Sequence, residues 1–183
     1  MSAAIHFRRI LASAIFIVIF GLHAGAQDAA PLTLQQMTRK AGRIFAAEVI
    51  RVQPAAPPGT TGSVRVSFRV HRAIRGVRTG QIVTITEWAG LWERSNQRYR
   101  LGEKVVLFLY PNSRAGLTSP VGGSLGRAVL DARGNVVLAP EQARLWFGRE
   151  RRLKRLRTAH RLIRFRDFAR EVRAAEFEYA DPE

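Results

Sequence analysis

The sequence contains no cysteine. That absence excludes a disulfide framework, a thiolate nucleophile and a cysteine zinc ligand, so the fold must be held together by apolar burial. Lysine is also scarce, because only Lys40, Lys104 and Lys154 of the 30 basic residues are lysine. The 14 acidic residues leave a formal net charge of +16. Such an excess favours anionic partners.

The chain has a single long apolar run, at residues 10–22. This run is too short for a membrane span, which needs about 20 residues. Arg8 and Arg9 precede it, and the small residues of 24–26 (AGA) follow it. This order predicts a signal peptide over residues 1–26, with cleavage before Gln27 and an exported location, periplasmic or secreted. The alternative is an uncleaved N-terminal anchor.

The chain after the leader is about one domain long. It carries 28 basic and 14 acidic residues. Outside the cytoplasm, this charge favours phospholipid headgroups, cell-wall polymers or an acidic partner protein. Nucleic acid is the usual partner of a basic protein, but the predicted leader argues against it here. No second apolar span follows, so we expect no transmembrane segment after cleavage.

Residues 43–138 have the pattern of short strands separated by turns. Residues 64–71 alternate strictly, which places Val66 and Phe68 in a core and Arg69 in water. Residues 105–110 are apolar on both faces, with Val106 and Phe108 also assigned to the core. Further strands are expected at 44–52 and 81–88, a hairpin turn at 132–135, and a short helix at 32–39 with Thr33 as a candidate cap. The fold class is therefore mainly β, with a small OB-like barrel of five or six strands over residues 27–140.

Residues 141–183 form an arginine-rich segment whose apolar residues follow a helical spacing. The stripe consists of Leu145, Leu153, Leu156 and Ile163. It predicts a basic helical extension packed on the barrel. Asp167 is expected to cap a last short helix, in which Phe168 and Val172 lie four residues apart and face the core. Alternatively, the extension lies on an anionic membrane surface. In that case Arg151, Arg152 and Arg155 are candidate binding residues.

The order of these features resembles the OB-like barrel of netrin modules and tissue inhibitors of metalloproteinases, in a disulfide-free bacterial exported form. The resemblance covers residues 37–138 and rests on segments 42–52, 64–76 and 102–110. It implies an OB-like fold and a secreted protease as a candidate partner. Those inhibitors chelate zinc through an N-terminal cysteine. This chain has none, so that mechanism does not carry over.

Two patterns in the sequence are typical of catalytic sites. Residues 122–126 (GGSLG) match the G-x-S-x-G elbow, and Ser124, Asp131 and His160 follow in hydrolase order. The elbow needs a helix after the serine, whereas a hairpin is expected here, so we expect no catalysis by Ser124. After the leader, the only histidines are His71 and His160. A catalytic zinc site takes three protein ligands, so we expect no metal and no cofactor.

The carboxylates offer one candidate site. Glu48 lies in an apolar strand, an environment that can perturb its pKa, but we expect a barrel-mouth or edge position paired with an arginine. Residues 87–93 (EWAGLWE) place two tryptophans and two glutamates near a strand end. Glu87, Trp88, Trp92 and Glu93 are therefore candidates for an aromatic, acidic rim at the barrel mouth. The alternative is that one tryptophan fills the bottom of the barrel.

Three functional hypotheses follow, in order of preference. The first is an exported, non-enzymatic module that binds a protein partner, with a secreted protease as a candidate. The second is a peripheral envelope protein held on anionic lipid or cell-wall polymer by its basic surface. The third is a small serine hydrolase that uses Ser124.

Overall fold

The computed structural model describes residues 32–54, 62–90, 98–147 and 162–177. Within this part of the chain, seven antiparallel strands form one sheet in the order β3-β2-β1-β4-β5-β6-β7. The strands are β1 (Arg43–Pro54), β2 (Ser63–Arg75), β3 (Ile82–Trp88), β4 (Lys104–Leu109), β5 (Arg127–Leu130), β6 (Asn135–Val137) and β7 (Leu162–Arg164). The predicted mainly β fold is confirmed.

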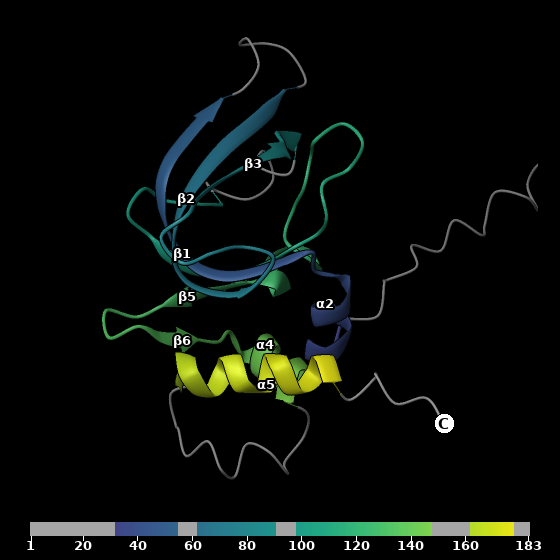
Figure 1. Ribbon diagram of the computed structural model, residues 1–183, viewed down its shortest axis with the longest axis vertical. Helices are drawn as coiled ribbons and strands as arrows, with labels where there is room; N and C mark the ends of the chain where they lie inside the picture. The colour runs from purple at the N-terminus through teal and green to yellow at the C-terminus, as the bar shows by residue number, and fades with distance from the viewer. Residues whose placement is uncertain (1–31, 55–61, 91–97, 148–161, 178–183) are drawn as a thin grey trace, which may run out of the picture. The chain divides into compact units, whose positions relative to one another are not determined.

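Three α-helices accompany the sheet in the described residues: α2 (Leu34–Lys40), α4 (Pro140–Phe147) and α5 (Phe165–Phe177). In Figure 1, α5 lies below β5 and β6, whereas β2 and β3 lie at the top. None of the described helices has the length and apolarity needed to cross a membrane. The predicted signal peptide lies outside the described residues.

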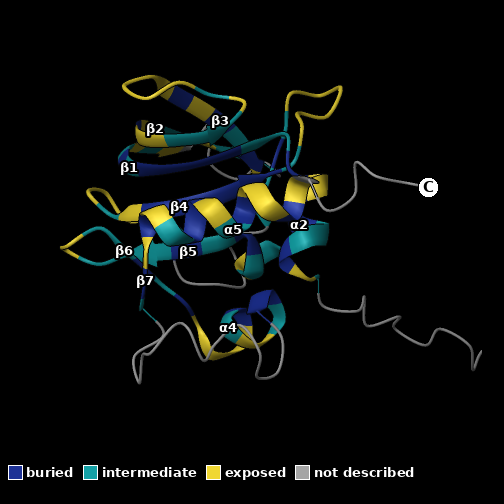
Figure 2. Cartoon of the chain, turned by 60° about the horizontal axis from the view of Figure 1, so that its bottom comes forward, coloured by how far each residue is buried: buried dark blue, intermediate teal, exposed yellow. Residues whose placement is uncertain are grey.

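Strands β1 and β4 separate two apolar cores. Figure 2 shows both strands as largely buried and central. Residues 105–109 of β4 are all buried, as its two-sided apolar pattern predicts. Val106 and Phe108 enter the core on the helix side, here called the helix-side core. Val105, Leu107 and Leu109 enter the other, here called the strand-side core.

The strand-side core is built by alternation along β1, β2, β3 and β4. In β2, Val66, Phe68 and Val70 are buried, while the residues between them face outward. This confirms the predicted facing of residues 64–71. The Phe68 ring meets the Tyr99 ring edge-on, with centroids 5.3 Å apart. Tyr99 precedes β4 and enters the core from the chain that connects β3 to β4.

The sheet is open in the described chain, because β3 and β7 are its two ends. The structure therefore does not confirm the closed OB-like barrel. The chain after β4 folds back on that strand and forms a bridge between Leu109 and Pro120. From this arm, the Thr118 N–H donates to the Thr86 carbonyl of β3 across 2.9 Å. A backbone hydrogen bond thus connects the arm after β4 to the outer edge of β3.

The helices close the helix-side core. Thr33 begins α2 with a capping box to Gln36, as a cap at Thr33 predicts. The Trp146 ring of α4 lies 5.6 Å from the Phe108 ring and 5.7 Å from the Phe168 ring of α5. Phe168 and Val172 are fully buried and face this core, as predicted.

The C-terminal part departs from the predicted helical stripe. Ile163 lies in β7, where it pairs with Val136. Strand β7 has only three residues, of which Ile163 is buried and Arg164 is exposed. Asp167 lies in the first turn of α5, which begins at Phe165, so Asp167 is not the cap. Leu145 packs half-buried against the helix-side core. Leu153 and Leu156 lie outside the described residues.

Candidate functional site

The end of β3 places Glu87 and Trp88 on opposite faces. Successive side chains of a strand point to opposite sides. Glu87 follows Val83 and Ile85 inward and is 0% exposed, whereas Trp88 is 49% exposed. The structure therefore does not bring Glu87 and Trp88 together on one acidic rim. Trp92 and Glu93 lie outside the described residues.

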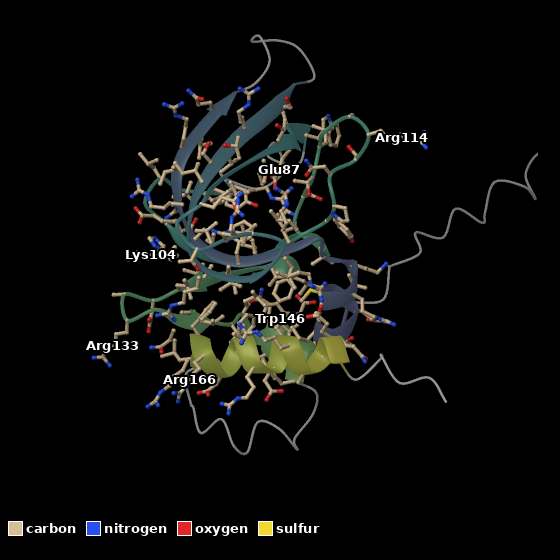
Figure 3. All side chains as sticks on the ribbon, in the orientation of Figure 1. Glu87, Lys104, Arg114, Arg133, Trp146 and Arg166 are labelled. Carbon is tan, nitrogen blue, oxygen red and sulfur yellow. The ribbon has the colours of Figure 1, made fainter. Side chains whose placement is uncertain are left out.

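Glu87 belongs to a buried polar cluster (Figure 3). The Tyr99 hydroxyl donates to Glu87 Oε1 across 3.1 Å. Arg98 Nη1 lies 3.5 Å from Glu87 Oε2, and the Arg98 side chain is only 12% exposed. A buried carboxylate is tolerated when it is paired and hydrogen-bonded. Burial and the neighbouring Glu87 charge raise the pKa of Tyr99 well above its ordinary value, so its hydroxyl remains a donor.

Arg127 covers the Tyr99 ring from β5. Its guanidinium carbon lies 5.6 Å from the ring centroid. Arg127 Nη2 also pairs with Glu103 Oε1 at 2.5 Å. These contacts join β5 to the turn before β4. The cluster is therefore a structural link between sheet segments. The sequence signal for a buried Glu87 is its place in the alternation that buries Val83 and Ile85.

The outward face of β2 and β3 presents a different chemistry. We define the β2–β3 face by its outward residues: Arg65, Ser67 and Arg69 on β2, and Ile82, Thr84, Thr86 and Trp88 on β3. Backbone register places Arg69 opposite Ile82. The Ser67 and Thr84 hydroxyls lie 2.9 Å apart. Ile82, at 58% exposed, and Trp88 are two of the three large hydrophobic side chains that are exposed in the described chain.

The Trp88 ring is held against the backbone at Gly90. A Cβ atom built on Gly90 would lie 2.5 Å from ring atoms Cη2 and Cζ2. The indole of Trp88 therefore occupies the space that the side chain of any residue larger than glycine would need at position 90. An aromatic side chain positioned in this way loses little conformational entropy when it binds a partner.

Charge on and near the β2–β3 face is mostly positive. Arg65 and Arg69 belong to it, and no Asp or Glu does. Glu48 of β1 lies opposite Arg69 in register, but its carboxylate contacts His71 at 3.3 Å. The prediction of an arginine partner for Glu48 is therefore wrong, because the histidine side chain reaches its carboxylate. The described part of the chain carries 20 basic and 8 acidic residues.

The surroundings of Ser124 differ from those of a hydrolase nucleophile. Ser124 lies in a short 3-10 turn, Gly123–Gly126, and strand β5 follows at once. The carboxylate of Asp131 accepts hydrogen bonds from Asn135, and these lower the pKa of Asp131. The Asp131 carboxylate therefore stabilises the β5–β6 turn. His160 lies outside the described residues.

Two further predictions concern metal binding and the arginines of the C-terminal segment. No group of three His, Cys, Asp or Glu side chains within the described ranges could hold a metal ion. Arg151, Arg152 and Arg155 fall outside those ranges, so binding by them stays a prediction.

Neither a protein-family model nor a curated protein matches the sequence. The resemblance to netrin modules and metalloproteinase inhibitors therefore stays a prediction. The candidate function rests on the chemistry of the described residues.

Proposed function

We propose that this chain is an exported, non-enzymatic module that binds a protein partner through the β2–β3 face. The observation that carries the proposal is Trp88, half-exposed and held against Gly90 at the end of the outermost strand. Tryptophan and arginine are the residue types that most often dominate binding free energy at protein interfaces. Arg65 and Arg69 occupy the neighbouring strand.

The charge of the face selects an acidic partner. Arg65 and Arg69 would be solvated in the free protein and could pair with carboxylates in the complex. After cleavage of the leader, the 28 basic and 14 acidic residues leave a net charge of +14, which adds long-range attraction for an acidic surface. Ser67 supplies a hydroxyl between the two arginines on β2, and Thr84 supplies another opposite it on β3. The result is a polar interface with one aromatic anchor.

The side chains of β3, rather than its free backbone edge, form the proposed contact. A bare edge strand can add a strand from a partner. Here the Thr86 carbonyl already accepts the Thr118 N–H. The arm that carries Thr118 therefore occupies part of this edge. The same hydrogen bond joins β3 to the arm after β4. It supports our proposal that β1 to β4 close in the manner of an OB-like barrel.

The resemblance to metalloproteinase inhibitors makes a secreted protease the first partner class to test. Contact through the β2–β3 face would inhibit such a protease sterically, because the bound module would cover part of the enzyme's surface. It would not chelate the zinc, because the chain lacks the N-terminal cysteine. The signal peptide would place this encounter outside the cytoplasm.

The proposal can be tested by quantitative affinity capture from the envelope and medium of the producing cells. The immobilised proteins would be the wild type, Trp88→Ala and Leu101→Ala. Leu101 is a matched control, because it is 71% exposed and lies in the turn before β4, outside the β2–β3 face. We expect the wild type and Leu101→Ala to retain the same partner. Trp88→Ala should bind it at least about tenfold more weakly.

Equal retention by Trp88→Ala and the wild type would contradict the proposal. Retention that vanishes for all three proteins at moderate salt would show that general charge, not the face, causes the capture.

A further inference from the structure

A second group of arginines surrounds a surface depression where β2, the β2–β3 turn and α5 meet. Arg72, Arg166 and Arg173 line its rim together with Thr79. Its floor is apolar and consists of Ala73, Phe165 and Ala169. We call it the arginine depression. It shares no residue with the β2–β3 face.

The helical spacing on α5 builds one wall. Arg166 and Arg173 are seven residues apart, which places them on one helix face about 10.5 Å apart along the axis. Ala169 lies between them, and because its side chain is short and buried, there is room for the depression above it. Arg170 lies outside the depression, where it pairs with Asp167.

Arg72 forms the opposite wall and is held in position. Its guanidinium carbon lies 4.9 Å above the centre of the Phe165 ring, a cation–π contact. Arg72 Nη2 also lies 3.7 Å from the position that a Cβ atom would take on Gly134 in the β5–β6 turn. Figure 3 shows Arg166 pointing into solvent on the same side of the view as Lys104 and Arg133.

The three arginines have no carboxylate partner among the described residues. Asp167, the acid of the first turn of α5, contacts Arg170 instead. Like charges gathered around a hollow repel one another, and an anion bound between them removes that cost. Guanidinium groups match phosphate oxygens with paired N–H donors. The Thr79 hydroxyl adds a neutral donor at the rim.

We propose that the arginine depression binds the phosphoryl group of a ligand. Three guanidinium groups suit a phosphate dianion better than a single carboxylate, because they can neutralise two charges and meet three terminal oxygens. The phosphoryl group would belong either to a small soluble phosphate or to a lipid headgroup. Binding here is independent of partner binding through the β2–β3 face.

The first test is a calorimetric titration of inorganic phosphate into the exported chain at low ionic strength. The double variant Arg166→Gln/Arg173→Gln should bind phosphate at least about tenfold more weakly than the wild type. The matched double control is Arg170→Gln/Arg144→Gln, which removes two exposed charges outside the depression. This control should stay within about twofold of the wild type. No binding by the wild type, or equal losses in both double variants, would overturn the proposal.

A charge-preserving variant keeps the test decisive if the glutamine variant does not fold. Arg166→Lys/Arg173→Lys retains both charges but removes the paired donors. Its phosphate affinity should fall several-fold below that of the wild type, with an unchanged melting temperature. Wild-type affinity in this variant would refute recognition by guanidinium groups.

Vesicles distinguish the two sources of phosphate. Phosphatidylcholine vesicles with and without phosphatidic acid would be sedimented with each protein. Binding to phosphatidic acid that is lost in Arg166→Gln/Arg173→Gln and displaced by inorganic phosphate identifies a lipid headgroup. Phosphate binding without vesicle binding identifies a soluble ligand. Vesicle binding that falls equally in both double glutamine variants would show general adsorption by charge and would contradict the site.

Discussion

The Tyr99 hydroxyl donates a hydrogen bond to Glu87 Oε1 across 3.1 Å, and both side chains are fully buried. Tyr99 comes from the chain before β4, whereas Glu87 comes from β3, the outermost strand. The bond therefore attaches the end of the sheet to the strand-side core. Trp88, the next residue, projects from the opposite face of the same strand. We infer that the cluster positions the surface that carries the proposed function.

Tyr99 should make the fold sensitive to alkaline pH. Its folded-state pKa is raised above 10.0 by burial and by the Glu87 charge. Its contribution to stability is therefore complete below pH 10.0 and is lost as the pH rises towards the folded-state pKa. The free energy of unfolding should fall there by about 1.4 kcal/mol per pH unit for this one proton.

Denaturant titrations at several alkaline pH values would measure this effect. Tyr99→Phe should lose the extra slope and should be less stable at neutral pH by about 1–3 kcal/mol, because Glu87 loses a donor. Tyr110→Phe, which leaves Tyr99 in place, should keep the slope. A slope that persists in Tyr99→Phe would assign the titration to another group.

Removal of the buried carboxylate should destabilise the protein strongly. Glu87→Ala leaves Arg98 and the Tyr99 hydroxyl without this acceptor, and we expect a loss of about 3–5 kcal/mol. Glu141→Ala removes a carboxylate from the exposed first turn of α4 and should cost less than about 1 kcal/mol. Urea denaturation of both variants would measure the difference. Equal losses would mean that the Glu87 cluster is not a structural link.

Several elements could be predicted because one local pattern determined each of them. The strict alternation of 64–71 placed Phe68 inward and Arg69 outward. The two-sided apolar run of β4 indicated a strand between two cores. Thr33, a residue type typical of helix caps, marks the start of α2. In each case the local residue preferences and the hydrophobic pattern of the sequence agree with the burial seen in the structure.

Other features depended on contacts that are distant in the sequence. The polarity of Glu87 favours a rim position, whereas its phase in β3 points inward. Its partner Tyr99 lies twelve residues away. The spacing of Ile163 favours a helix, because a strand of three residues, β7, is too short to show its own period. The arginine depression joins Arg72 to residues of α5, and no local pattern indicates that approach.

The facing of β2 can be tested by a pair of neighbouring substitutions. Phe68→Ala removes a fully buried ring and should lower the free energy of unfolding by about 3–5 kcal/mol. Arg69→Ala changes an exposed side chain and should cost less than about 0.5 kcal/mol. Denaturant titration would measure both. Similar losses would show that the strand faces are misassigned.

Ser124 should not behave as an activated nucleophile. It lies in a short turn before a strand, and Asp131 is engaged by Asn135. We therefore expect no labelling of the purified protein by a fluorophosphonate probe. Stoichiometric labelling that Ser124→Ala abolishes would instead make the hydrolase hypothesis the leading one.

Site-specific photo-crosslinking in the producing cells tests the proposed interface most directly. A photoreactive residue would replace Thr84, at the centre of the β2–β3 face, or Arg144, which is exposed on α4. We predict that one acidic protein is crosslinked from position 84, at a yield that Trp88→Ala reduces and Leu101→Ala does not. Crosslinking of that protein from position 144 alone, or an equal yield in Trp88→Ala, would contradict binding through the β2–β3 face.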